Sequence, residues 1–248
     1  MTKLSVLVPT RNEAANLEEC LRSVAFADEI VVVDSESTDD TRAIAERCGA
    51  RVLVHPFAGH AAQKNWGLER VTHDWVLILD ADERATPELA REVREILASP
   101  SAPGYWIHRR NTFLGREIRG CGWQRDKVLR LFDRRHGRYE DVRVHEEVRL
   151  DAGAGQLREK LWHHSCTDLG AWLEKVDRYS TLGAEEAMRR GRRPRFGDLS
   201  GRPVARFAKQ WLVQGGWRDG IEGWILCVTS AYSVFLKYAK LRRLEGRR

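Results

Sequence analysis

Residues 30–41 read IVVVDSESTDDT and residues 76–83 read VLILDADE. In each stretch four apolar residues run directly into an aspartate, Asp34 or Asp80. Short, continuous apolar runs of this kind are typical of strands buried on both faces. The hydroxyl and carboxylate side chains after Asp34 can begin a helix, and Gly49 is placed to end it. The two stretches therefore predict neighbouring parallel strands joined by helices.

The same alternation extends through the first hundred residues. We expect strands at 4–8, 30–33, 51–55 and 75–79, and helices at 14–24, from about 38 to 48, and from Thr86-Pro87 onward. After the break at 99–104 the chain becomes β-rich, and from about residue 169 it becomes helical. We therefore predict an α/β fold: a doubly wound, mostly parallel sheet over 1–100, a β-rich part over 101–165, and a helical extension over 166–248.

Composition excludes several classes of protein. The chain has 248 residues, 42% of them hydrophobic, a net charge of +6 and a mean hydropathy of -0.50. It is too apolar for a disordered chain and too polar for a polytopic membrane protein. Five cysteines without a CxxC pair indicate neither a disulfide framework nor a thiolate zinc site. With no signal-peptide pattern after Met1, we expect a cytoplasmic protein.

The acids that follow the strands form the candidate site. In an open parallel sheet, ligands bind outside the carboxyl ends of the strands. Asp80 and Asp82 can point the same way from an extended segment, and two carboxylates suit Mg²⁺ or Mn²⁺ bound together with a diphosphate. Asp34 could hold a base or ribose edge. The alternative is structural: Asp82 and Glu83 would then favour the start of the next helix, and Asp34 would cap a turn beside Ser35 and Ser37.

Four motifs in order give a resemblance to family 2 glycosyltransferases of the GT-A fold. They are VPTRNEAANLEECLRSV (8–24), IVVVDSESTDDT (30–41), QKNWGLE (63–69) and VLILDADE (76–83). The resemblance implies a Rossmann-like half that binds a UDP-sugar and a divalent metal, Mg²⁺ or Mn²⁺. Asp82 would be the direct metal ligand with Asp80 beside the ribose and metal, and the nucleotide-sugar would be bound by Pro9, Arg11, Glu13, Asp34, Lys64, Asn65, Asp80 and Asp82.

Further motifs resemble the branch of that family that adds glucose to the inner core of lipopolysaccharide. They are residues 111–132, YEDVRVHEEV (139–148) and HHSCTDL (163–169). An inverting transfer needs one general base, and a carboxylate suits that role. The resemblance favours Glu146, with Asp141 as the second candidate. Alternatively, Glu146 lies on a solvated β face, or orients His145 or an arginine.

Candidate acceptor contacts are four basic side chains. Arg125 and Arg130 could meet acceptor phosphates, and His145 and His163 could contact the acceptor itself. Because adjacent residues of a strand point to opposite faces, His163 and His164 are not expected to bind one metal ion together.

The C-terminal part is strongly basic. Residues 189–248 contain 15 Lys and Arg against 4 Asp and Glu, a net charge of +11. An amphipathic helix is expected from Val204, and the uncharged stretch 223–236 is too short to span a bilayer. We predict a helix at the surface of an anionic membrane, and the alternative is a helix packed on the catalytic domain with a solvated basic end.

These observations predict an inverting, metal-dependent hexosyltransferase on the cytoplasmic face of the inner membrane. Its donor would be UDP-glucose and its acceptor a sugar of the lipopolysaccharide core. One alternative acceptor is a polyprenyl phosphate or another lipid-linked glycan. A nucleic-acid-binding protein would explain the basic tail but not the strand-end acids, so no nucleic acid is expected as a partner.

Overall fold

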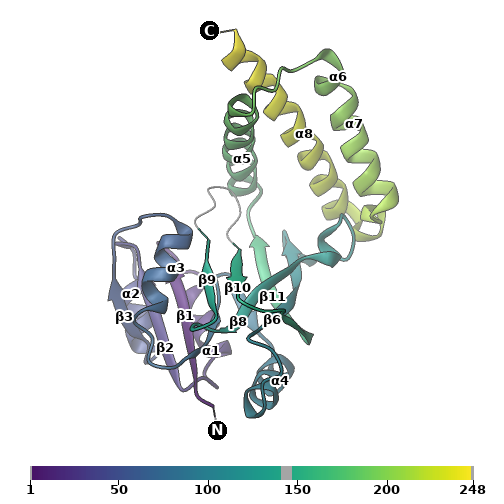
Figure 1. Cartoon of the computed structure of the whole chain (residues 1–248). Helices are drawn as coiled ribbons and strands as arrows, with labels where there is room; N and C mark the ends of the chain where they lie inside the picture. The colour runs from purple at the N-terminus through teal and green to yellow at the C-terminus, as the bar shows by residue number, and fades with distance from the viewer. Residues whose placement is uncertain (1, 141–146, 247–248) are drawn as a thin grey trace. The chain divides into compact units, whose positions relative to one another are not determined.

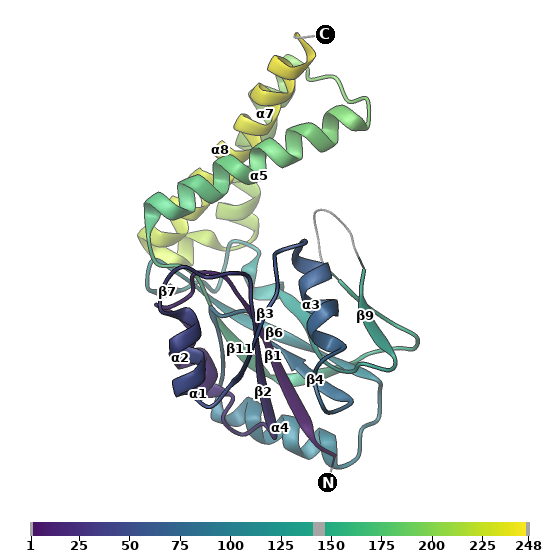
Figure 2. The same ribbon diagram turned by 90° about the vertical axis from the view of Figure 1, so that its left-hand side faces the viewer.

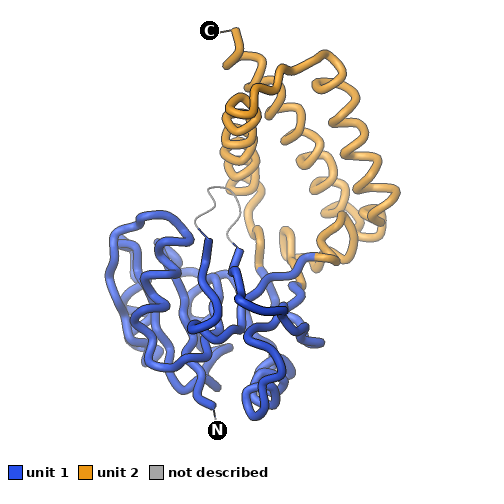
Figure 3. The backbone as a smooth tube through the Cα atoms, in the orientation of Figure 1, with its two compact units in different colours: residues 1–109, 126–163 blue, residues 110–125, 164–248 orange. Residues whose placement is uncertain are grey.

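The computed structural model describes residues 2–140 and 147–246 (Figure 1). The chain forms two compact units, residues 1–109 with 126–163 and residues 110–125 with 164–248 (Figure 3). The boundaries fall within strands β6 (Gly104–Phe113) and β11 (Gly155–Cys166). Residues 110–125, expected in the β-rich part, thus belong to the unit that contains the C-terminal helices. The functional division at residues 165 and 166 stays a prediction.

The first unit is built on the predicted parallel strands. In spatial order these are β3 (Arg51–Val54), β2 (Glu29–Asp34), β1 (Leu4–Thr10) and β4 (Trp75–Ile78). The sheet continues beyond β4 through the antiparallel β8 (Lys127–Asp133), then β6, β11 and β5 (Glu83–Ala85). The short strand β7 (Arg116–Glu117) pairs with β6. Two further short strands, β9 (Gly137–Tyr139) and β10 (Val148–Leu150), pair with each other.

Helices cover both faces of the parallel strands, as a doubly wound sheet requires (Figure 2). One face packs on α1 (Leu17–Ser23), α2 (Thr41–Arg47) and α4 (Pro87–Ala98), and the other packs on α3 (His60–Leu68). On β1, Val6 and Val8 belong to the first core, whereas Leu7 belongs to the second. This alternation confirms the predicted α/β class.

The second unit contains the predicted C-terminal helices. These are α5 (Leu169–Arg189), α6 (Phe196–Leu199), α7 (Gly201–Ala208), the π-helical turn η2 (Lys209–Val213), the 3-10 turn η3 (Gly216–Asp219) and α8 (Gly220–Glu245). A further 3-10 turn, η1, spans Trp123–Arg125. Gly215 and Gly220 adopt positive φ angles of 72° and 66°, which makes the sharp turn before α8 possible. Over residues 2–140 and 147–246, no helix has both the length and the hydropathy that a bilayer span needs.

Candidate active site

The loops after β1 and β2 are bound to each other at the carboxyl end of the sheet. The Asn12 backbone N–H donates to Ser37 Oγ (2.9 Å), and the Asn12 side chain accepts from the Thr38 N–H (2.9 Å). Asn12 has a positive φ of 55°, a conformation that asparagine tolerates better than most residues. The structure thereby brings the loop of Arg11 and Glu13, which follows Pro9 at the end of β1, beside the loop that follows Asp34. Binding of a nucleotide by these residues stays a prediction.

Asp34 is fully buried and its carboxylate is engaged within its own turn. It accepts from the Ser37 N–H (3.0 Å), from the Ser37 hydroxyl and from the Thr10 hydroxyl (3.4 Å), and Arg42 lies 3.7 Å away. The turn-capping role that the sequence left open is therefore present. Binding of a base or ribose by Asp34 stays a prediction.

Asp80 lies between two buried cations. Lys64 Nζ is 3.1 Å from its Oδ1, and Arg130 donates to its Oδ2. Burial raises the pKa of Asp80, but Arg130 and Lys64 outweigh that effect and hold it well below its usual range. Asp80 therefore remains ionised, and each of its oxygens has a cationic partner.

Glu83 supports Asp80 from inside the protein. Its side chain is fully buried, and it accepts from the Asp80 N–H (2.9 Å), from Arg130 (3.1 Å) and from Arg109 (3.2 Å). Arg109 in turn binds Asp126 through two hydrogen bonds of 2.9 and 3.0 Å. Glu83, Arg109 and Asp126 were not among the predicted site residues. Its place as the third acid of the stretch DADE (80–83) was the available signal for Glu83.

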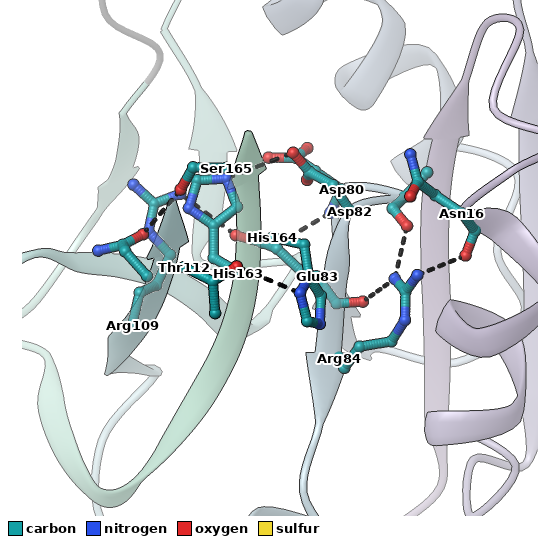
Figure 4. A network of polar contacts seen from close by, with 12 residues as sticks. Asn16, Asp80, Asp82, Glu83, Arg84, Arg109, Thr112, His163, His164 and Ser165 are labelled. Carbon is teal, nitrogen blue, oxygen red and sulfur yellow. Dashed lines mark hydrogen bonds and ion pairs between the residues drawn. The ribbon is translucent and has the colours of Figure 1, made fainter. Parts of the chain in front are cut away.

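Asp82 faces a histidine from a distant strand (Figure 4). Its Oδ2 lies 3.4 Å from His163 Nε2, and the two side chains are 31% and 14% exposed. Antiparallel pairing explains the contact, because His163 is opposite Glu83 in the register of β11 and β5. The neighbouring His164 instead has its Nδ1 3.3 Å from Thr112 Oγ1, so the two histidines have different partners, as strand alternation predicts.

The Asp82–His163 pair suits a divalent cation. Adjacent ligand atoms of an octahedral ion with bonds of about 2.1 Å lie about 3 Å apart, close to the observed 3.4 Å. Because one ligand atom is an imidazole nitrogen, the pair suits a transition metal such as Mn²⁺ better than Mg²⁺, which prefers oxygen ligands. Asp80 is less available as a direct ligand because Lys64 and Arg130 already bind it. Among the described residues no group of three or more His, Cys, Asp and Glu side chains converges on one point. A metal here would need further ligands from substrate and water.

Negative charge accumulates around this point. Burial raises the pKa of Glu13, and the carboxylates of Asp82, Asp39 and Asp80 raise it further, although a hydrogen bond from Asn16 (2.8 Å) lowers it. Asp80 is already paired with Lys64 and Arg130, so Asp82 and Glu13 are the carboxylates here whose repulsion a bound cation could relieve.

The remaining predicted residues separate into three groups. Asn65 holds the backbone of Tyr139, accepting from its N–H (3.0 Å) and donating to its carbonyl (2.9 Å), so both ends of its amide support β9. Arg125 lies exposed in η1, whereas Arg130 is buried against Asp80 and Glu83. Asp141, His145 and Glu146 lie outside the described residues, so their predicted roles stay predictions.

Comparisons with known proteins show the family of the chain. The model of the family "Glycosyl transferase family 2" matches residues 5–161. The chain is 33% identical over 246 residues to the lipopolysaccharide core biosynthesis glycosyltransferase LpsC of Rhizobium meliloti. This match covers 96% of this chain and 91% of that protein. It is 30% identical to an uncharacterized glycosyltransferase of Rickettsia felis, with 98% and 90% covered.

Solved structures give a more limited similarity. Glucosyl-3-phosphoglycerate synthase from Mycobacterium tuberculosis, in complex with Mn²⁺, UDP and glucosyl-3-phosphoglycerate, is 26% identical with a TM-score of 0.39. That match covers 45% of this chain and 44% of the synthase, so it spans less than half of either protein.

Proposed function

The chain belongs to glycosyl transferase family 2, and from that premise we propose that it is an inverting, metal-dependent hexosyltransferase that moves glucose from UDP-glucose to a sugar of the lipopolysaccharide core. The observation that supports the donor half best is the pairing of Asp82 with His163 beside Asp80, whose pKa is held well below its usual range. The acceptor is proposed from the similarity to the Rhizobium lipopolysaccharide core glycosyltransferase and from the motifs after residue 110.

We assign distinct tasks to the two aspartates. Asp82 and His163 would hold the metal, which when bound stabilises the charge that develops on the leaving diphosphate. Asp80, fixed by Lys64 and Arg130, would accept a hydrogen bond from the donor's ribose. The loops of Pro9, Arg11 and Glu13 and of Asp34 would enclose the base.

The general base is proposed among the carboxylates after β9. Glu146 remains the first candidate and Asp141 the second. Asn65 of α3 holds the backbone of Tyr139, the last residue of β9, through two hydrogen bonds. The base takes the proton from the acceptor hydroxyl as that hydroxyl attacks the anomeric carbon.

Exchange of each candidate base for its amide tests this assignment. Glu146→Gln should lower kcat about 10²- to 10³-fold, because the acceptor proton then has no base, while UDP and metal binding remain unchanged. Asp141→Asn serves as the matched control and should retain most activity. If Asp141→Asn loses turnover and Glu146→Gln does not, the base has been misplaced.

Thermal denaturation with nucleoside diphosphates tests the donor half. UDP with Mn²⁺ or Mg²⁺, at about 100 times the dissociation constant, should add roughly 2.7 kcal/mol and raise Tm by roughly 5 to 10 °C. UDP with EDTA should give a much smaller shift, because the metal links the diphosphate to Asp82. An equal shift with ADP or GDP would contradict uridine selectivity, and no shift with any nucleotide would contradict the proposed site.

We also propose that the acceptor is reached at the inner, cytoplasmic surface of the membrane. A lipopolysaccharide core sugar is attached to lipid, so the enzyme must work close to a bilayer. A polyprenyl-linked acceptor would make the same demand. Transfer assays with the two kinds of acceptor distinguish these substrates.

A further inference from the structure

An exposed apolar face runs along α8 in the second unit. Its side chains recur at intervals of three and four residues, so they lie on one side of the helix within about a quarter of its circumference. We call it the α8 face, and it consists of Ile221 (73% exposed), Trp224 (48%), Val228 (41%), Tyr232 (48%) and Phe235 (41%).

The opposite side of α8 accounts for the packing within this unit. Leu226, Cys227, Tyr238 and Leu241 are buried, and α8 lies between α5 and α7 (Figure 1). Trp172 Nε1 of α5 donates to Thr229 Oγ1 (2.9 Å), which fixes one flank of the helix. Within the α8 face, Trp224 also packs edge-to-face on Phe207 and Trp211, with ring centroids 5.0 and 5.1 Å apart. Ile221 and Val228 remain 73% and 41% exposed.

The turn that leads into α8 exposes further large apolar side chains. Leu212 is 67% exposed, Val213 is 81% exposed and Trp217 is 54% exposed. Together with the α8 face, the second unit thus exposes several large apolar side chains along α8 and the turn before it, four of them aromatic. Exposed apolar side chains that gather on one part of a protein often mark an interaction site. Tryptophan and tyrosine are the residues that favour the boundary between lipid and water.

Exposed cations accompany this surface. Arg242 follows Phe235 by seven residues and thus continues the α8 face, and Arg243 lies next to it. On α7 and the following turn, Arg202, Arg206 and Lys209 are also exposed. Apolar side chains flanked by arginine and lysine match an anionic lipid surface, where the headgroups attract cations and the acyl boundary accepts apolar groups.

We propose that the α8 face and the preceding turn, rather than the basic residues alone, form the site that docks this unit on an anionic bilayer. A second copy of the chain fits less well, because each copy has a net charge of +11 over residues 189–248 and the two would repel. A nucleic acid would not require the aliphatic side chains of Ile221 and Val228. The inference specifies the membrane contact of the proposed function, and it can be tested without transfer activity.

Flotation of the full chain with vesicles tests the proposal. Wild type should bind vesicles of phosphatidylglycerol and phosphatidylcholine, bind pure phosphatidylcholine weakly, and lose affinity as salt increases. Ile221→Glu/Val228→Glu should lower the partition coefficient by about tenfold or more, because it adds two charges to the inserted face. Val54→Glu/Phe57→Glu is the matched control, since those apolar residues are 50% and 44% exposed in the first unit.

Three outcomes would overturn the proposal. They are failure of wild type to float with anionic vesicles, equal loss of binding in both double variants, and conversion of a dimer into a monomer by the α8 variant while vesicle binding persists. The Tm shift with UDP is measured on the same variants to separate the two ideas. If wild type fails to bind vesicles but shows the Tm shift with UDP, only the docking proposal is wrong. If wild type binds vesicles but shows no Tm shift with UDP, only the proposed donor site is wrong.

Discussion

Asp82→Ala should lower metal-dependent transfer by more than about 10³-fold while the protein stays folded. The proposed metal would lose its carboxylate ligand, and the leaving diphosphate would lose the charge that stabilises it. Asp82 is 31% exposed and its described ion-pair partner is His163, so its removal should change the free energy of unfolding by less than about 1 kcal/mol. Initial rates with saturating Mn²⁺, together with denaturant unfolding, measure both effects.

The chain offers a matched control for this variant. Asp151 also faces a histidine, with Oδ2 3.7 Å from His136 Nδ1, but it is 77% exposed and lies away from the strand-end acids. Asp151→Ala should therefore retain wild-type transfer. Full activity of Asp82→Ala would end the metal assignment, and equal loss in both variants would show that the effect is not specific to the site.

The strand-end acids were predictable because they depend on local sequence. Apolar runs define the strands, and parallel strands place Asp34 and Asp80 at one edge of the sheet. The partners of these acids were not predictable in the same way. His163 reaches Asp82 only through the register of β11 against β5, nearly eighty residues apart in sequence, and no periodicity fixes that register.

The burial of Arg130 was also not predictable from the sequence. A basic residue on a β-rich stretch suggested an exposed contact with acceptor phosphate. Its position in β8 instead buries it against Asp80 and Glu83. The alternation of β8 is hard to interpret from sequence because every residue from Leu129 to Asp133 is buried. Burial of an arginine can be predicted only when the positions of its carboxylate partners in the fold are known.

Arg130→Leu should destabilise the fold by about 3–5 kcal/mol at neutral pH. Arg130 is 5% exposed, and its loss leaves Asp80 with Lys64 alone and Glu83 with Arg109 alone. Removal of one partner from a buried ion pair leaves a charge that is poorly compensated. Arg91→Leu is the control: Arg91 is 73% exposed beside Glu88, so its loss should cost less than about 1 kcal/mol.

The pH dependence of that loss separates electrostatics from packing. The pKa of Asp80 is lowered in the folded protein, so its stabilising contribution is complete above the unfolded value of about 4 and declines as pH falls below it. In Arg130→Leu the folded pKa should rise toward normal, because one cation is absent. The difference between wild type and variant should therefore be largest near pH 7 and shrink once pH falls below the folded pKa of Asp80 in the variant. An NMR titration that gives Asp80 the same lowered pKa in both proteins would mean that Arg130 stabilises the fold through packing and not through Asp80.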